Sequence, residues 1–317
     1  MSTPVIIAII LAAVLLLALL FFGILFWIYS FAFGRSHTDC APEDGLDSEA
    51  MRPYADENRK RITALLNEEY EDVYIESPLD KIRLHARLYH RREGAPIQIM
   101  CHGYRSNPYR DFSGGALEAL GAGHNLLLID QRAHLGSEGK TITFGIKERH
   151  DLLGWAEYIA ARFPSSAIIL VGISMGGATV VAAASLPMPA AVKCIVSDCP
   201  YGIVRDVLVS TAKKMHFPAF VYPLIRLSGK IFGGFDANDG DFTAHASKSR
   251  LPIIILHGEA DRLVPEEMSA LIERANPKMI RRLTFPGARH GISYLTDRDR
   301  YVDAVYSFID EHTASAL

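Results

Sequence analysis

The first 34 residues contain no Lys, Arg, Asp or Glu, and the stretch from Val5 to Phe33 is almost wholly apolar. As an α-helix this stretch is roughly 40 Å long, which exceeds the roughly 30 Å hydrocarbon layer of a bilayer. A signal peptide has an apolar region of only about 7–15 residues, preceded by a basic segment that is not found here. We therefore predict that residues 1–34 form a retained transmembrane anchor, with a cleaved signal peptide as the alternative.

The residues that flank the apolar stretch indicate its orientation. No basic side chain precedes it, whereas Arg35 and Arg52 follow it. Basic residues are enriched on the cytoplasmic side of membrane helices, so this asymmetry favours a cytoplasmic position for the rest of the chain. The sequence thus predicts a single-pass cell-membrane protein whose large C-terminal part faces the cytoplasm.

Charge and cysteine content exclude several classes of site. The 33 Lys and Arg residues nearly balance 36 Asp and Glu residues, so the chain has no global positive field that would attract nucleic acid, and no nucleic-acid partner is expected. The four cysteines are Cys40, Cys101, Cys194 and Cys199. They form no CxxC pair and have no His partners at zinc-finger spacing, so neither a structural zinc site nor a disulfide framework is predicted. Those at 101 and 194 lie in apolar runs and are expected to be buried and reduced.

After residue 70, short β-rich runs alternate with helical stretches. The predicted strands are 73–76, 82–89, 97–101, 126–130, 168–171, 192–197, 253–256 and 281–285. The predicted helices are 115–120, 147–162, 176–186, 265–275 and 299–311. Several strands are continuous apolar runs, as is typical of strands covered on both faces. This alternation predicts an α/β fold with a doubly wound, mostly parallel sheet.

Three segments follow from this pattern. Residues 1–34 are the anchor, residues 35–70 are expected to be a polar linker with a juxtamembrane helix, and residues 71–317 form the α/β domain. About 50 residues, 199–250, separate two strands of that domain and are rich in aromatic and aliphatic side chains. A structureless loop of this length is improbable. We therefore predict a helical lid over a pocket, with a plain helical insertion as the alternative.

One short motif indicates a nucleophile. The strand-like run 167–171 leads into Gly172-Ile-Ser174-Met-Gly176, and small residues typical of a helix start follow. Small residues in G-x-S-x-G permit the sharp strand-to-helix turn that lifts a serine hydroxyl above a sheet edge. A phosphate-binding loop is the competing interpretation, but no GK[ST] follows the motif. Ser174 is therefore the predicted nucleophile.

A serine hydroxyl needs a base to take its proton and an acid to orient that base. Asp261 and His290 each follow a predicted strand, in the chain order Ser, acid, His. Both positions lie at the edge of the sheet where ligands bind in open α/β folds. Asp198, which follows the strand at 192–197, is the runner-up acid, although capping of the next segment is its simpler role.

A tetrahedral intermediate also needs hydrogen-bond donors for its oxyanion. His102-Gly103-Tyr104 follows the strand 97–101, and the glycine permits a turn that directs the Tyr104 amide inward. The second predicted donor is the amide of Met175, directly after the nucleophile. Both are main-chain groups, so the backbone path matters more than the side chains.

Together these motifs resemble the α/β-hydrolase superfamily across residues 97–310. The segments Asp130-Gln-Arg-Ala-His134, Ser137-Glu-Gly139 and Thr143-Phe-Gly145 resemble the membrane-anchored bacterial serine hydrolases of the Bem46-like and prolyl-oligopeptidase-related branch. Members usually carry Gly directly after that His, whereas this chain has Leu135 there. The resemblance implies a serine hydrolase without metal or organic cofactor.

The leading functional hypothesis is a membrane-anchored hydrolase of carboxylic esters, with a small ester or lipid-like molecule as substrate. The same three side chains also suit a peptidase or aminopeptidase, or a thioesterase that removes acyl groups from proteins. A non-catalytic binding protein on the same fold is the alternative from another class. The lid is expected to select the acyl chain, and the anchor to deliver the enzyme to its lipid without taking part in the chemistry.

Overall fold

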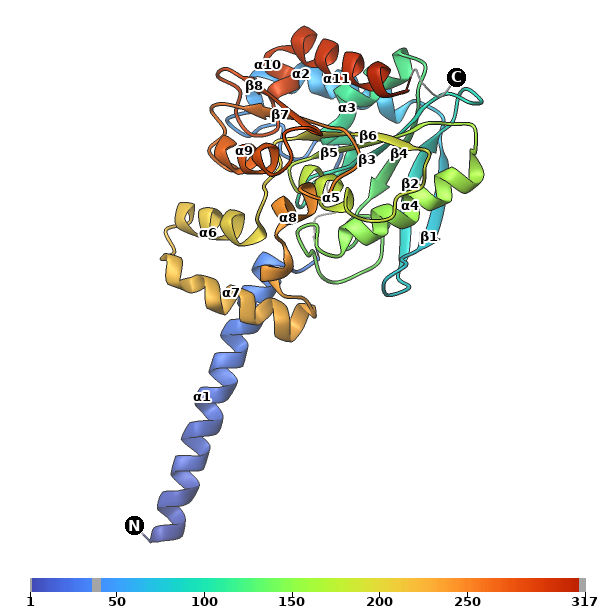
Figure 1. The fold of residues 1–317 in the computed structure, drawn as a ribbon. Helices are drawn as coiled ribbons and strands as arrows, with labels where there is room; N and C mark the ends of the chain where they lie inside the picture. The colour runs from blue at the N-terminus through green and yellow to red at the C-terminus, as the bar shows by residue number, and fades with distance from the viewer. Residues whose placement is uncertain (1, 36–40, 314–317) are drawn as a thin grey trace.

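The computed structural model describes residues 2–35 and 41–313 of the chain. An α/β body carries one long helix, α1 (Thr3–Ala32), which projects away from it (Figure 1). The length and composition of α1 make it a candidate membrane span. All its residues from Thr3 to Ile24 are exposed. Cys40 lies outside the described residues, and the other three cysteines are buried and free.

A single sheet of eight strands forms the body, in the order β1-β2-β4-β3-β5-β6-β7-β8. The strands are β1 (Glu71–Glu76), β2 (Arg83–Tyr89), β3 (Ile97–Cys101), β4 (Asn125–Asp130), β5 (Ile168–Ile173), β6 (Val192–Asp198), β7 (Ile253–Gly258) and β8 (Ile280–Phe285). Of the eight strands described, β2 alone runs in the opposite direction to the others. The prediction of a mostly parallel, doubly wound sheet is therefore confirmed.

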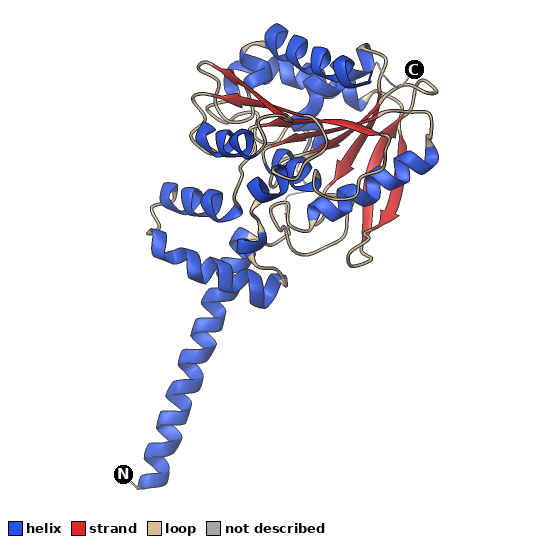
Figure 2. Ribbon diagram, viewed as in Figure 1, coloured by secondary structure: helices blue, strands red, loops and turns tan. Residues whose placement is uncertain are grey.

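Helices cover both faces of the sheet (Figure 2). The main ones are α2 (Ala55–Leu66), α3 (Pro108–Gly121), α4 (Glu148–Arg162), α5 (Met175–Ala183), α9 (Glu266–Ala275), α10 (Ser293–Thr296) and α11 (Arg298–Thr313). A short helical turn, η1 (Arg52–Tyr54), precedes α2. Side chains of α2, α3 and α11 form the core on one face, and those of α4, α5 and α9 help to form the core on the other.

Alternation within each strand supplies both cores. In β3, Ile97, Ile99 and Cys101 join the core beneath α4 and α5, whereas Met100 joins the core beneath α3 and α11. Successive strand residues point to opposite faces, so a strand buried on both sides must be apolar throughout. This requirement explains why the central strands read as continuous apolar runs.

The segment predicted as a polar linker is packed onto the body. Leu46, Ile62 and Leu65 are fully buried in the core shared with α3 and α11. The helix α2 packs along α3. Residues 41–66 thus contribute to the globular body instead of merely spacing it from α1.

The C-terminal end of α1 is docked against the same body. Phe33 is fully buried and packs edge-to-face on Phe144 and Phe235. The Tyr29 hydroxyl lies 2.7 Å from Thr141 Oγ1, and Gly34 forms a β-bridge with Thr141. Packing and hydrogen bonds therefore hold the C-terminal end of α1 on the α/β body.

Residues 199–250 form an insertion of short helices between β6 and β7. Its elements are α6 (Val204–Lys214), η2 (Ala219–Val221), α7 (Tyr222–Ser228), η3 (Gly229–Gly233), η4 (Ala237–Asp239) and α8 (Phe242–Ala246). Within it, α7 and η3 pack against α1. Figure 1 shows α7 crossing the end of α1 where that helix meets the body.

Candidate active site

Ser174 occupies a strained turn between β5 and α5. Its backbone lies at φ 56° and ψ −113°, a conformation that is rarely populated by residues other than glycine. A Cβ on Gly172 would lie 2.2 Å from the Gly176 carbonyl oxygen, and one on Gly176 would lie 1.8 Å from the Cys101 carbonyl oxygen. Only glycine fits at these two positions, which is why the G-x-S-x-G pattern is required here.

The structure brings Ser174, His290 and Asp261 together from the ends of three strands. His290 Nε2 lies 2.8 Å from Ser174 Oγ, and His290 Nδ1 lies 2.6 Å from Asp261 Oδ2. In this arrangement the neutral ring donates through Nδ1 to the carboxylate and accepts from the serine hydroxyl through Nε2. The predicted serine, acid and histidine thus form one connected hydrogen-bond chain.

Asp261 is held as a carboxylate. Burial alone would raise its pKa, but hydrogen bonds from His257 and His290 outweigh burial and hold the pKa well below its usual range. The second oxygen, Oδ1, accepts the backbone N–H groups of Leu263 at 2.8 Å and Val264 at 2.9 Å. These bonds fix the carboxylate in the orientation that His290 needs.

Asp198, the runner-up acid, is near His290 but, among the described hydrogen bonds, forms none with it. It ends β6, and its carbonyl oxygen accepts the Ser174 N–H at 2.9 Å. Its side chain is buried, and Oδ1 has no hydrogen-bond partner among the described residues. Burial raises the pKa of this carboxyl to about 6. Geometry therefore favours Asp261 as the partner of the histidine and leaves Asp198 a role in the turn below Ser174.

The predicted oxyanion donors flank the nucleophile. Met175 is the first residue of α5, so its N–H belongs to the first helical turn, where backbone donors lack intrahelical partners. On the other side, a Cβ on Gly103 would lie 3.5 Å from Ser174 Cβ, which places the turn at 103–105 against the serine. The Tyr104 amide lies in this turn.

Two polar side chains, the partly buried Asp111 and the buried His134, hold the turn, a role that the sequence motifs did not assign to them. Asp111 accepts the Gly103 N–H at 2.7 Å, and His134 Nε2 accepts the Arg105 N–H at 3.0 Å. His134 Nδ1 bonds to the Arg132 carbonyl oxygen at 2.9 Å, so the ring is neutral and protonated on Nδ1. Burial, together with the nearby His102 ring, lowers the pKa of His134 to about 3.

The same turn also contacts the end of α1. The Tyr104 hydroxyl donates to the Ala32 carbonyl oxygen at 3.0 Å. The Arg105 guanidinium donates to the carbonyl oxygens of Ser30 at 3.2 Å and Gly34 at 3.3 Å. The last carbonyls of a helix lack intrahelical partners, so a cation here satisfies them and complements the helix dipole.

Leu135 stands where the sequence resemblance leads us to expect glycine. Its backbone adopts φ 41°, in the left-handed region. Its carbonyl oxygen accepts Arg35 Nη2 at 2.6 Å, while Arg35 Nη1 bonds to the carbonyl oxygens of Ser137 and Gly139. A left-handed turn is thus formed by leucine, and Arg35, three residues beyond the end of α1, is bound to it.

A cavity of about 380 Å³ opens beside Ser174 and His290. It extends between the sheet and the helices α3 and α11, where its walls include Met100, Val171, Val196 and Val305. Residues 45–58 contribute to its rim. None of its lining residues belongs to the insertion at 199–250, so the expectation that the insertion covers this pocket is wrong.

One set of three potential metal ligands is found among the described residues. It consists of Cys199, Asp261 and His290, whose donor atoms lie within 4.8 Å of one another. Both ring nitrogens of the histidine are already engaged, one by the carboxylate and one by Ser174. This arrangement favours proton transfer over metal coordination.

Comparisons with known proteins agree with this architecture. The family model described as "alpha/beta hydrolase fold" matches residues 98–240. YqkD of Bacillus subtilis, an uncharacterized protein, is 25% identical over 217 residues, which cover 67% of this chain and 70% of that protein. The esterase Pf2001 of Pyrococcus furiosus superposes with a TM-score of 0.63 at 23% identity and covers 78% of this chain and 95% of its own. Est1E of Butyrivibrio proteoclasticus, solved with ferulic acid, gives 0.60 at 22% identity and covers 76% and 99%.

Proposed function

Because this chain belongs to the α/β-hydrolase superfamily, we propose that it is a serine hydrolase that cleaves carboxylic esters, anchored in the cell membrane by α1. The observation that carries the proposal is the hydrogen-bond chain from Ser174 Oγ through His290 to Asp261. A positioned nucleophile, a neutral base and an ionised acid are the three groups that acyl transfer to serine requires.

In the first half-reaction, Ser174 Oγ attacks the ester carbonyl carbon while His290 Nε2 accepts the hydroxyl proton. The negative charge that develops on the carbonyl oxygen is stabilised by the N–H groups of Tyr104 and Met175. The imidazolium, stabilised by the Asp261 carboxylate, then gives its proton to the leaving alkoxide. An alcohol departs and the acyl group remains esterified to the serine.

In the second half-reaction, water replaces the alcohol. His290 accepts a proton from this water as it attacks the acyl carbonyl, and the same two amides stabilise the second oxyanion. The imidazolium returns the proton to Ser174 Oγ as the acid leaves. One ester and one water thus become one alcohol and one carboxylic acid, with the enzyme regenerated.

The cavity supports an acyl group as the part of the substrate that is recognised. Val171 lies three residues before Ser174 on β5, so the cavity extends about 10 Å down the sheet face at about 3.3 Å per residue. Its volume falls within the usual range for small-molecule sites, roughly 300–1,000 Å³. Apolar walls bury methylene groups favourably, at about 0.8 kcal/mol each.

Two further observations support the ester class and the anchor. One of the solved neighbours, Pf2001, is named as an esterase, and another, Est1E, was solved with ferulic acid bound. The exposed part of α1 offers a wholly apolar surface, which favours a lipid environment and esters that partition into lipid. Resemblance to the Bem46-like branch of membrane-anchored hydrolases fits the same picture.

The test uses a fluorophosphonate probe on the full-length protein. We expect the probe to label Ser174, and Ser174→Ala to abolish labelling and lower turnover by about 10⁴–10⁶ while the protein stays folded. A panel of matched esters, thioesters and peptides should then show esters as the best substrates. Labelling that persists in the alanine variant would refute the nucleophile, and preference for peptides or thioesters would replace the ester assignment.

A further inference from the structure

The docked and free parts of α1 set the height of the body above a membrane. From Thr3 to Ile24 every residue of α1 is exposed, whereas Leu25, Ile28 and Tyr29 are buried against the body. The free part is about 33 Å long at about 1.5 Å per residue, close to the roughly 30 Å hydrocarbon layer of a bilayer. Whatever packs on the last turns of α1 therefore lies at the membrane surface.

The elements at that height belong to the insertion. Phe232 of η3 packs on Phe26 at 5.3 Å and on Tyr29 at 5.8 Å between ring centroids. Helix α7 crosses α1 at the same place (Figure 1). A helix that runs across the end of a membrane span lies along the plane of the bilayer surface, where amphipathic segments bind.

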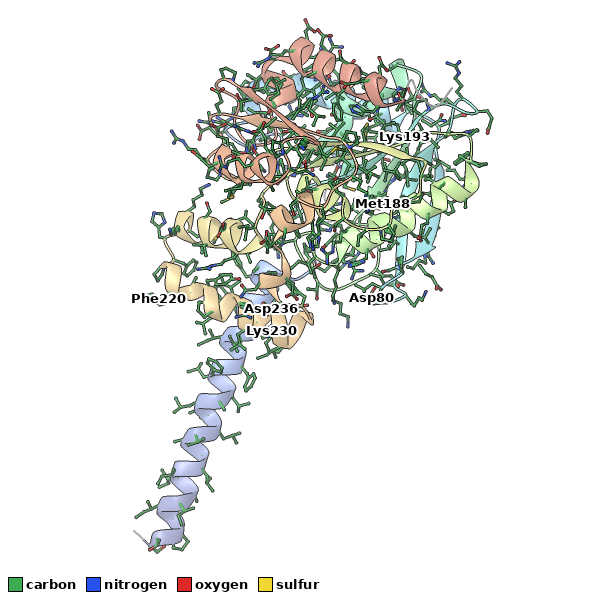
Figure 3. The ribbon with its side chains drawn as sticks, in the orientation of Figure 1. Asp80, Met188, Lys193, Phe220, Lys230 and Asp236 are labelled. Carbon is green, nitrogen blue, oxygen red and sulfur yellow. The ribbon has the colours of Figure 1, made fainter. Side chains whose placement is uncertain are left out.

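The tip between α6 and α7 exposes apolar side chains. Phe220 is 79% exposed, Met215 is 43% exposed and Phe217 is 41% exposed. In Figure 3, Phe220 lies at the outer end of the insertion, away from the α/β body. Exposing large apolar side chains to water is unfavourable in free energy, whereas burying them in the headgroup region of a membrane is favourable.

The charge of the insertion matches an anionic surface. Residues 207–235 contain Lys213, Lys214, Arg226 and Lys230 and no Asp or Glu. The last two pair with Asp236, near the junction with α1 (Figure 3). Lys213 and Lys214 are exposed and adjoin the exposed apolar residues. No salt bridge involves either lysine among the described residues, although Lys214 is close enough to Asp261 for a Coulombic interaction, and partial burial lowers the pKa of Lys214. Lysines beside an apolar tip are the combination that anionic membranes attract.

From these observations we propose that the tip of the insertion, residues 213–220, is a lipid-contacting surface that inserts into the headgroup region of an anionic membrane. It takes the apolar side chains at 215, 217 and 220 into the interface while the two lysines contact lipid phosphates. This inference rests on the anchoring role proposed for α1. It also assigns the insertion a function other than covering the cavity.

The experiment places an environment-sensitive fluorophore at the tip of the full-length protein. Phe220→Cys is labelled with a nitrobenzoxadiazole dye in a Cys40→Ser background, since the other three cysteines are buried. Leu66→Cys, 43% exposed on α2, is the matched control, because α2 lies on the far side of the body from α1 (Figure 1). Both proteins are reconstituted in vesicles of phosphatidylcholine with or without phosphatidylglycerol.

The dye at 220 should shift its emission to the blue in vesicles and be quenched by nitroxide-labelled lipid, whereas the dye at 66 should show neither effect. Phosphatidylglycerol should enlarge the shift at 220, and salt or the pair Lys213→Gln and Lys214→Gln should remove that enlargement. If the protein co-floats with the vesicles but the dyes at 220 and 66 respond alike, the proposed lipid-contacting surface is overturned and the anchor is not. Protein that fails to float would overturn both the surface and the anchor, while fluorophosphonate labelling of Ser174 reports separately on the hydrolase.

Discussion

The Tyr104 hydroxyl donates a hydrogen bond of 3.0 Å to the carbonyl oxygen of Ala32, 72 residues earlier in the chain. One partner lies in the turn that supplies a proposed oxyanion donor, and the other ends the proposed membrane helix. Arg105, the next residue in the turn, binds the same helix end through Ser30 and Gly34. The helix that was expected only to deliver the enzyme therefore contacts the turn that positions the oxyanion.

Tyr104→Phe should lower kcat on a short soluble ester by about tenfold, less than the roughly 10²–10³ lost when an oxyanion donor is removed outright. The backbone N–H remains but loses a bond that holds it, so KM and the melting temperature should change little. Affinity for a trifluoromethyl ketone, whose adduct carries an oxyanion, should fall in parallel with kcat. Tyr29→Phe, which removes the bond to Thr141 at the same interface, is the control and should keep kcat. Equal kcat in both variants would contradict a positioning role.

Asp261→Asn should reduce kcat by about 10⁴, because an amide holds the wrong histidine tautomer and does not stabilise the imidazolium. Asp198→Asn should reduce it far less, since its carboxyl is buried beside the turn and does not bond to His290. The measurement is kcat of the two variants on one ester, with circular dichroism to verify folding. A reversed order would show that the histidine uses the other acid.

Narrowing the cavity should shorten the preferred acyl chain. In the wild type, each methylene that the cavity buries should raise kcat/KM by about fourfold, the equivalent of about 0.8 kcal/mol. Val171→Phe should abolish this gain for longer chains and leave acetate esters nearly unaffected. Phe217→Ser with Phe220→Ser, assayed in detergent on dispersed esters, should keep the wild-type profile because neither side chain lines the cavity. If the chain-length profile of kcat/KM changes in the insertion variant instead, the insertion selects the substrate.

Asp198 should make the protein less stable as pH rises through the weakly acidic range. Its pKa is about 6 in the folded protein, against roughly 3.9 in an unfolded chain, so between about pH 4 and pH 6 the folded state holds a proton that the unfolded state has released. Up to about 3 kcal/mol of unfolding free energy should be lost across this window. Urea unfolding at several pH values, compared between wild type and Asp198→Asn, isolates the effect. The difference between the two proteins should grow in favour of the variant as pH rises, and a constant difference would exclude Asp198 as its source.

The sequence predicted the sheet and the grouping of Ser174, Asp261 and His290 because both follow from local patterns. Buried parallel strands must be apolar along their length, and the turns after them must carry the reactive side chains. Strand ends shifted by one or two residues, as for β5, which ends at Ile173 and not at residue 171. Hydrogen bonding continues into the turn, and composition does not reveal where it stops.

Contacts between distant segments were not predictable in this way. Asp111 has no signal in the sequence, and His134 belongs to a motif that did not indicate its partner; only the tertiary fold brings both side chains to the backbone of the turn at 103–105. The insertion was assigned to the pocket because it leaves the sheet at the same edge as Ser174. Its direction is set instead by packing on α1 through Phe232, a long-range contact without a local signal.

Phe33 is buried, and Arg35 is bonded to the turn at 135–139 just beyond the end of α1, so the described part of the proposed membrane helix is fixed on the body at several points. A domain joined to its membrane anchor by a flexible linker samples many orientations, so substrate can approach its active site from any side. Here the body keeps one orientation relative to α1, since rotating α1 about its axis rotates the opening of the cavity by the same angle. Lipids diffusing in the bilayer should therefore approach Ser174 from one side of α1 only. Polarised fluorescence of a dye fixed rigidly to the body, measured in aligned membranes, should show a single preferred orientation of the body.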